Sequence, residues 1–192
     1  LDAALGERHA EWTARLGGAG LPGWESALPT FEVGESVATR VALAKALTAI
    51  VDVVPGLMAG GADLTGNTGT ELKGQTALSP EHPEGRQIHF GVREHAMGAT
   101  MNGMALHGGV LPVGGTFLVF SDYMRPSVRL AALMGTKVIF AWSHDSVGVG
   151  EDGPTHQPVE HVAALRAIPG LDVMRPADAN ETVHAVRLAV DV

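Results

Sequence analysis

The order of apolar and polar positions predicts strands and helices that alternate along most of the chain. Short apolar runs predict buried strands at 57–61, 87–90, 110–115, 137–142 and 171–174. Apolar positions at helical spacing predict helices at 36–51, 93–107, 117–134, 158–167 and from 180 to the end. Ser36 is the expected N-cap of the first of these helices. Strands separated by helices are typical of a doubly wound α/β fold, so we expect a mostly parallel sheet with helices on both faces.

The first 35 residues follow a different pattern. A helical pattern over 1–17 includes Leu5 and Trp12, and a glycine-rich run at 17–23 interrupts it. Residues 24–35 have no regular period. We therefore predict a linker or arm at 1–35 that leads into one domain at 36–192. The chain begins with Leu1 and stops within a helical pattern, so we interpret it as a fragment, with one domain expected before it and another after it.

Composition narrows the class of protein. The chain is 45% hydrophobic, which is enough for a sizeable core. Its net charge of −8 disfavours nucleic acid as a partner, because phosphate backbones require clustered Lys and Arg. There is no apolar run of about 18 residues or more, so no membrane span is predicted. Cysteine is absent, which excludes disulfides and thiol catalysis and is consistent with a cytoplasmic protein.

Polar residues gather after the predicted strands. In parallel sheets, ligands bind outside the carboxyl ends of the strands. The segments at those ends are 63–70, 91–94, 116–123, 144–156 and 175–180. The run from Ser143 to Gln157 is the richest, with three carboxylates and two imidazoles in a stretch without regular period. Loops of this length in compact domains are usually functional or disordered, and we expect this one to be a site.

Two of these segments contain candidate ligand-binding groups. Glu94 begins a predicted helix, where the helix dipole favours an acid. It is also a candidate for exchanging a proton with a buried ligand nitrogen. Phe117, Phe120 and Tyr123 recur every three residues at a predicted helix start. They are either ordinary core residues or an aromatic face for a flat heterocycle.

The predicted helix at 93–107 has an unusual composition. Met97, Met101 and Met104 lie at helical spacing, which is typical of core packing. Gly98 and Gly103 weaken the helix intrinsically. We expect another helix or a ligand to pack closely against both glycines.

Two kinds of chemistry remain open for the polar run. His144, Glu151, Asp152 and His156 are possible metal ligands, and a metal-dependent hydrolase built on His144, Asp152 and His156 is one alternative. Ser143 or Ser146 with a histidine could also suggest a hydrolase. The spacing of the possible metal ligands matches no compact metal motif, and no nucleophile-elbow sequence is present. Hydrogen bonding to a polyhydroxylated substrate uses the same groups more naturally. Arg40 lies within a predicted helix, where a solvated charge is the default and a phosphate partner is possible.

Three motifs together resemble a known family. They are Gly-Val-Arg-Glu-His-Ala-Met-Gly at 91–98, Gly-Gly-Thr-Phe-Leu-Val-Phe-Ser-Asp-Tyr at 114–123, and His-Asp-Ser-Val-Gly-Val-Gly-Glu-Asp-Gly-Pro-Thr-His-Gln-Pro at 144–158. This combination resembles transketolase, with dihydroxyacetone synthase as a close relative. The resemblance runs from about Leu28 to the end and covers the central, pyrimidine-binding domain of a three-domain enzyme.

The resemblance implies thiamine diphosphate as cofactor, with Mg²⁺ or Ca²⁺. The metal ligands are expected in the preceding domain and none in this chain. Glu94 corresponds to the catalytic acid that hydrogen-bonds N1′ of the aminopyrimidine and so favours removal of the thiazolium C2 proton. Phe117, Phe120 and Tyr123 correspond to the pyrimidine pocket, with Phe120 as the stacking ring. Asp63 corresponds to an acid near the cofactor.

The resemblance also implies sugar phosphates as substrates. His144 and Asp152 match contacts to substrate hydroxyls, and His156 and Arg40 match residues near the phosphate, with His156 also expected to be catalytic. Near Asn67 the family has a phosphate-binding serine, so this contact departs from the pattern. The expected reaction transfers a two-carbon ketol unit from a ketose phosphate to an aldose phosphate, in the pentose phosphate pathway.

The resemblance also bears on the oligomeric state. It implies a homodimer for the full-length enzyme, whose cofactor lies between subunits. The chain alone is expected to be inactive, because the diphosphate-binding domain is not in it. The alternative is a non-catalytic dimerisation module or a split subunit that needs a separate partner chain.

Overall fold

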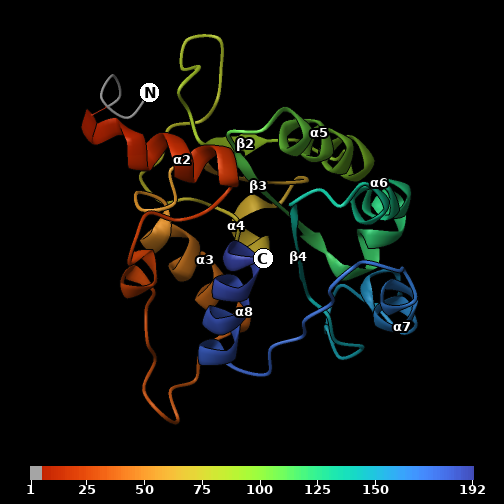
Figure 1. Ribbon diagram of the computed structural model, residues 1–192. Helices are drawn as coiled ribbons and strands as arrows, with labels where there is room; N and C mark the ends of the chain where they lie inside the picture. Colours follow the sequence, from red (N-terminus) through yellow and green to blue (C-terminus); the bar gives the residue numbers. More distant parts are fainter. Residues whose placement is uncertain (1–5) are drawn as a thin grey trace.

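The computed structural model of the protein describes residues 6–192, without the side chain of residue 7. Its centre is a parallel sheet with the strand order β2-β1-β3-β4 (Figure 1). The strands are β1 (Leu57–Gly61), β2 (Gln87–His89), β3 (Leu111–Phe117) and β4 (Ile139–Ser143). In the register, Gly60 of β1 pairs with Ile88 of β2 and with Gly114 of β3. Gly114 in turn pairs with Phe140 of β4.

Helices cover both faces of this sheet. The α-helices are α2 (His9–Gly17), α3 (Thr39–Ile50), α4 (Thr65–Thr68), α5 (Glu94–His107), α6 (Ser121–Met134), α7 (His161–Arg166) and α8 (Ala179–Asp191). Short 3₁₀ turns are η1 (Gly6–Arg8), η2 (Trp24–Ala27), η3 (Leu118–Phe120) and η4 (Pro154–His156). Figure 1 shows α3 and α8 together on one side and α5, α6 and α7 on the other. This arrangement confirms the predicted doubly wound α/β fold. None of the described helices has both the length and the apolarity needed to cross a bilayer.

The face under α3 and α8 is packed with aliphatic side chains. Leu47 and Ile50 of α3 meet Val183 of α8 and Leu111 of β3 in one buried cluster. Trp24 of the preceding arm joins the same cluster, so the arm packs against the domain. The boundary at residue 35 stays a prediction, and Leu5 of the predicted first helix lies outside the described residues.

The face under α5 and α6 is packed around methionine. Met97 and Met101 of α5 are fully buried there beside Met124 of α6, which confirms the core role of these two, whereas Met104 is only partly buried and lies outside the cluster. Gly114 of β3 is required, because a Cβ at this position would clash with Sδ of Met101. Gly98 permits close packing of α5 on α6, since its Cβ would lie 2.8 Å from Cβ of Ser127.

Gly103 behaves differently from Gly98. A Cβ at Gly103 would meet no atom of the described chain within 4 Å. Close packing of a helix is therefore confirmed for Gly98, and for Gly103 no helix of the described chain supplies it. Helical position alone does not distinguish the two, because the neighbouring helix α6 passes only one of them.

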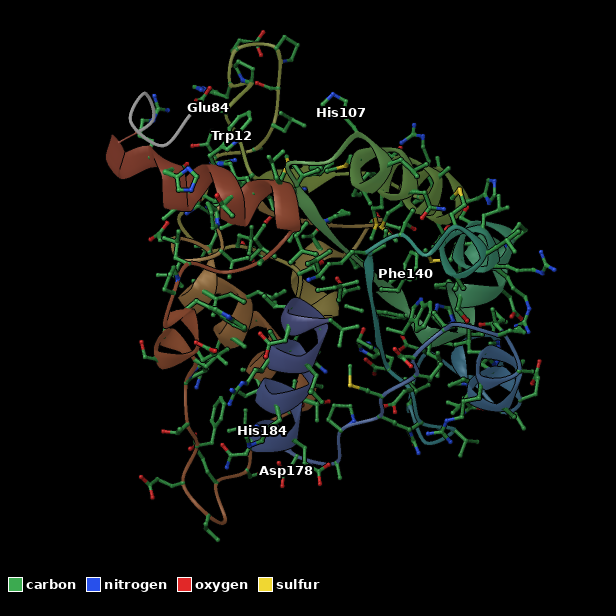
Figure 2. All side chains as sticks on the ribbon, in the orientation of Figure 1. Trp12, Glu84, His107, Phe140, Asp178 and His184 are labelled. Atoms are coloured by element: carbon green, nitrogen blue, oxygen red, sulfur yellow. The ribbon has the colours of Figure 1, made fainter. Side chains whose placement is uncertain are left out.

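The predicted strand at 171–174 is wrong. The segment is irregular, and a groove of about 970 Å³ is lined by both this segment and strand β4. A strand needs a hydrogen-bonded ladder with its neighbour, and across this groove no ladder forms. Phe140 of β4, labelled in Figure 2, lies beside the groove and stacks on Trp142 with ring centres 5.7 Å apart.

Two predicted helix starts also differ from the structure. Helix α3 begins at Thr39 rather than after Ser36, and its N-cap Ala38 makes no side-chain capping bond. The chain before it is tied down elsewhere, because Asn180 exchanges two hydrogen bonds of 3.0 Å with the backbone of Phe31. Phe117 ends β3 instead of beginning a helix, because pairing with β4 extends the strand by two residues beyond the predicted end.

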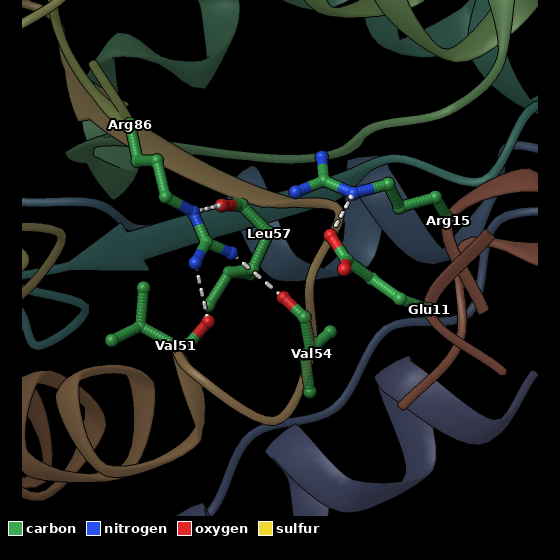
Figure 3. Close-up of polar contacts among 6 residues, drawn as sticks. All are labelled: Glu11, Arg15, Val51, Val54, Leu57 and Arg86. Carbon is green, nitrogen blue, oxygen red and sulfur yellow. Dashed lines mark hydrogen bonds and ion pairs between the residues drawn. The ribbon is translucent and has the colours of Figure 1, made fainter. Parts of the chain in front are cut away.

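One side chain, Arg86, connects three segments at the amino end of the sheet (Figure 3). Its guanidinium donates hydrogen bonds to the carbonyl oxygens of Val51 at 2.6 Å, Val54 at 2.7 Å and Leu57 at 2.8 Å. Burial lowers the pKa of Arg86 from its ordinary value. Arg86 thus links the start of β2 to the end of α3 and the start of β1.

Candidate active site at the carboxyl ends of the strands

Two residues that directly follow strands have unusual backbone conformations. Asp63 after β1 has φ of 71°, and His144 after β4 has φ of 54°. Within residues 6–192 they are the two non-glycine residues with positive φ. Such conformations are strained for residues with a Cβ, and they cluster at functional sites. Both residues are among those that the sequence predicts to be functional.

Asp63 and Asn67 lie on the same pocket. It has a volume of about 490 Å³, and Glu71 and His89 also line it. Asn67 belongs to α4, a single helical turn that the sequence did not predict. The pocket is thus at the carboxyl ends of β1 and β2, with polar groups from both.

Glu94 is the first residue of α5, which follows β2 after a short turn. Its side chain is buried, with 9% of the residue exposed. Within residues 6–192, no side chain or backbone group forms a hydrogen bond or an ion pair with its carboxylate. The residue is largely buried, but its carboxylate oxygens are not among the buried polar atoms that lack a partner, so they remain accessible. Glu94 is therefore free to bind a ligand group.

The three aromatic residues form a ladder of nearly parallel rings. Phe117 and Phe120 have ring centres 6.2 Å apart at 13°, and Phe120 and Tyr123 are 5.6 Å apart at 14°. They come from three successive elements, because β3 ends at Phe117, η3 at Phe120, and Tyr123 lies in the first turn of α6. Phe117 is buried, whereas Tyr123 is 66% exposed, so the ladder runs from the core to the surface.

The loop after β4 folds back onto this ladder. The His144 ring stacks on Phe117 with centres 3.8 Å apart. The His156 ring meets Phe120 edge-on at 5.1 Å and Phe117 at 6.1 Å. The structure therefore brings together both histidines and the aromatic residues, which are separate motifs in the sequence.

Charged groups surround His144. Burial lowers the pKa of its imidazole from the ordinary value, and the positive charge of Arg40 acts in the same direction. The charge of Asp152 opposes this shift, whereas that of His156 adds to it. Arg40, in the first turn of α3, thus contributes to the same electrostatic environment as the loop residues. A lowered pKa keeps His144 neutral at pH 7, so one ring nitrogen can donate and the other can accept a hydrogen bond.

Two contacts that hold the loop were not predicted. Ser143 Oγ lies 2.9 Å from Nδ1 of His144, which orients the imidazole. Arg175 Nε lies 2.6 Å from Oδ2 of Asp145 and anchors the loop to the segment 171–176. The sequence offered no signal for Arg175, because the contact depends on how two distant segments pack.

The metal-dependent hydrolase alternative finds no geometric support. His144, Asp152 and His156 do not form a group of possible ligand atoms close enough to share a metal ion. In the part of the chain that the structure describes, the one such group is Asp122, Glu160 and His161.

A family model described as "Transketolase, pyrimidine binding domain" matches residues 35–192. The chain belongs to this transketolase family. The transketolase of Geobacillus stearothermophilus is 55% identical over 193 residues, which cover 98% of this chain and 29% of that protein. Membership implies dependence on thiamine diphosphate.

Solved transketolase structures have the same fold. The transketolase of Leishmania mexicana superposes with a TM-score of 0.92 at 47% identity, covering 98% of this chain and 28% of that one. A transketolase of Pichia stipitis in complex with sedoheptulose-7-phosphate gives a TM-score of 0.92 at 43% identity, covering 99% and 29%. The chain thus spans less than a third of the length of these transketolases.

The residues present fit the pyrimidine part of that cofactor. Glu94 offers a buried carboxylate without a partner in the described chain, which suits a ring nitrogen that carries a proton. The ladder of Phe117, Phe120 and Tyr123 offers flat apolar surfaces, which suit an aromatic heterocycle.

Proposed function

We propose that this chain forms the pyrimidine-binding half of a transketolase active site. The reaction transfers a two-carbon ketol unit from a ketose phosphate to an aldose phosphate, as in the pentose phosphate pathway. Thiamine diphosphate, when bound, supplies the electron sink for the two-carbon unit. The observation that supports this proposal most directly is the carboxylate of Glu94, which has no partner in the described chain and belongs to a residue only 9% exposed.

Glu94 manages one proton in this proposal. Its carboxylate accepts a hydrogen bond from N1′ of the aminopyrimidine and holds a proton at that atom. The position at the start of α5 stabilises the negative charge of the carboxylate through the helix dipole. The low exposure of the residue limits the competition of water for this hydrogen bond.

The aromatic ladder orients the same ring. Phe120 is half-buried, and the centres of the nearly parallel Phe117 and Tyr123 rings lie 6.2 Å and 5.6 Å away, so these rings are offset from Phe120 and leave part of its face uncovered. We assign Phe120 as the ring on which the pyrimidine stacks. Asp63, at the carboxyl end of the neighbouring strand β1, is assigned to the vicinity of the cofactor.

The loop after β4 and the start of α3 bind the sugar phosphate. His144 is held neutral, so it exchanges hydrogen bonds with a substrate hydroxyl, and Asp152 accepts one from another. Arg40 supplies the positive charge for the phosphate, beside His156, which also takes part in proton transfer. Asn67 lines the pocket beside Asp63 and replaces the serine expected there.

The complete site requires more than this chain. The chain spans 29% of the Geobacillus stearothermophilus relative, so we assign the diphosphate and its Mg²⁺ or Ca²⁺ to other parts of the enzyme. We also propose that the full-length enzyme is a homodimer. The chain by itself is expected to show no ketol transfer with thiamine diphosphate and Mg²⁺.

The test replaces one buried carboxylate in a full-length transketolase that carries this chain as its pyrimidine domain. Glu94→Gln should lower kcat for ketol transfer by about 10² to 10⁴-fold, because the amide cannot hold the N1′ proton. Glu84→Gln is the control, since Glu84 is an exposed carboxylate on the loop before β2 (Figure 2). Wild-type turnover in Glu94→Gln, with an unchanged cofactor requirement, would overturn the assignment of Glu94. Ketol transfer by the isolated chain would overturn the assignment of the diphosphate and metal to other parts of the enzyme.

A further inference from the structure

Three possible metal ligands meet between α6 and α7, and none of them has a role assigned above. Asp122 lies in the first turn of α6, Glu160 is the N-cap of α7 and His161 is its first residue. One ligand atom from each residue lies within 4.8 Å of the others. Two carboxylates and an imidazole are the donor set that zinc and related divalent ions prefer in proteins.

The imidazole of His161 is buried without a satisfactory hydrogen bond. The residue is only 5% exposed, and neither ring nitrogen has a hydrogen-bond partner of acceptable geometry within residues 6–192. Buried ring nitrogens are normally paired, so this arrangement needs an explanation. A protein side chain does not supply it in the described chain, whereas an ion from solvent would occupy one of the two nitrogens.

The two carboxylates lie beside different nitrogens of the His161 ring, and the Nε2 contact with Asp122 has the separation of two ligands of one metal ion. Its Nε2 lies 3.2 Å from Oδ2 of Asp122, and its Nδ1 lies 3.9 Å from Oε2 of Glu160. The 3.2 Å contact does not meet hydrogen-bond geometry even though the two atoms are close. Nitrogen and oxygen ligands of one tetrahedral zinc ion lie about 3.4 Å apart and do not point at each other. An ion beside the imidazole therefore accounts for a separation that a hydrogen bond does not.

The two carboxylates can adjust to such an ion. The Asp122 side chain is 53% exposed and that of Glu160 is 72% exposed, so both can rotate and both are reached from solvent. The helices that carry the ligands are already fixed, because Arg125 Nη2 donates a 2.7 Å hydrogen bond to the carbonyl oxygen of Ala164. Arg125 Nη1 also lies 4.0 Å from Oδ1 of Asp122, so it faces the carboxylate oxygen that His161 does not contact.

We propose that Asp122, Glu160 and His161 bind one divalent transition-metal ion, with zinc as the best-suited ion and solvent as a further ligand. One nitrogen of His161 and one oxygen from each carboxylate form the ligand set. The bound ion links the first turn of α6, which carries Tyr123, to the start of α7, which follows η4 and His156. Zinc therefore stabilises the connection between the aromatic ladder and the loop.

The experiment titrates the purified, chelator-treated chain with Zn²⁺ by calorimetry and with Co²⁺ by visible spectroscopy. One Zn²⁺ per chain should bind, and Co²⁺ should show the intense bands of a tetrahedral site with nitrogen and oxygen ligands. His161→Asn should weaken Zn²⁺ binding by more than about tenfold and remove those bands, because an essential ligand is lost. Zn²⁺ should also raise the Tm of the wild-type chain and not that of the variant.

Matched variants distinguish Zn²⁺ binding at this site from nonspecific Zn²⁺ binding to surface histidines. His107→Asn and His184→Asn change exposed histidines on α5 and α8, both labelled in Figure 2, and should leave the Zn²⁺ affinity unchanged. Asp122→Asn alters an exposed ligand, so it tests the site even if His161→Asn misfolds. Absence of one-to-one binding would overturn the proposal, and so would equal affinity in the wild type, His161→Asn and Asp122→Asn.

Discussion

The two ends of the sheet differ in whether their polar groups have hydrogen-bond partners within the chain. At the amino end, Arg86 donates hydrogen bonds to three backbone carbonyls. At the carboxyl end, Glu94 is buried without a partner in the described chain, and Asp63 and His144 hold strained backbone conformations. Satisfied polar groups stabilise a fold, whereas unsatisfied and strained ones cost stability and persist where a ligand compensates.

The aromatic residues show the same contrast. Trp24 and the aliphatic cluster around Leu47 are sealed from solvent under α3 and α8. The ladder from Phe117 to Tyr123 instead leads from the core to the surface. An exposed aromatic ring beside a polar loop is typical of a binding surface rather than of a core. The core and the candidate site of this domain therefore differ in the exposure of their aromatic rings and in the hydrogen bonding of their polar groups.

The largest expected effect is on the free energy of unfolding, when the Arg86 hydrogen bonds at the amino end of the sheet are removed. Arg86→Met should lower the free energy of unfolding by about 3–5 kcal/mol, because three carbonyl groups lose charge-assisted hydrogen bonds. Urea or thermal unfolding of the chain measures this effect. Arg15→Met is the control, since Arg15 pairs with Glu11 on the surface of α2 and should contribute less than about 1 kcal/mol (Figure 3). Equal losses in the two variants would contradict the contrast.

A smaller effect of opposite sign is expected at the carboxyl end. Asp63→Gly should stabilise the chain by about 0.5–1 kcal/mol, because glycine adopts the left-handed conformation without strain. Asp52→Gly is the matched control, because Asp52 is an exposed aspartate without positive φ. This variant should be destabilised by a similar amount, since glycine makes the unfolded chain more flexible. Unfolding curves of both variants test the sign. If Asp63→Gly destabilises the chain instead, the positive φ of Asp63 does not cost stability.

The smallest expected effect is a change in the titration of His144. Burial and Arg40 hold its pKa below the ordinary value of 6.5. The folded state therefore binds this proton less readily than the unfolded state. The free energy of unfolding should fall as the pH drops from 6.5 toward the lower folded pKa.

NMR titration of the imidazole distinguishes the causes of this shift. Arg40→Gln should raise the pKa of His144, because a repelling positive charge is removed. Asp152→Asn should lower it further, because an attracting negative charge is removed. Arg129→Gln, on the exposed face of α6, should have no effect. An unchanged or lowered pKa in Arg40→Gln would show that Arg40 does not act on the loop.

Much of the fold was predictable from the sequence. The runs that became β1 and β2 and the spacing that became α5 and α8 are local patterns, and each was identified within a few residues. The strand at 171–174 was predicted wrongly for the same reason, since its local pattern resembles a strand although no neighbour pairs with it. The start of α3 was misplaced because a distant residue, Asn180, ties down the chain before it.

The sequence by itself determined the alternation of strands and helices, the end of the sheet where polar residues gather, and the motifs that mark the family. These follow from periodicity and order along the chain, which are local properties. Only the tertiary structure decided that His144 stacks on Phe117, that Arg86 reaches three carbonyls, and that Asp122 meets His161. Such meetings depend on which surfaces pack together, and packing is set by the whole core rather than by any single segment.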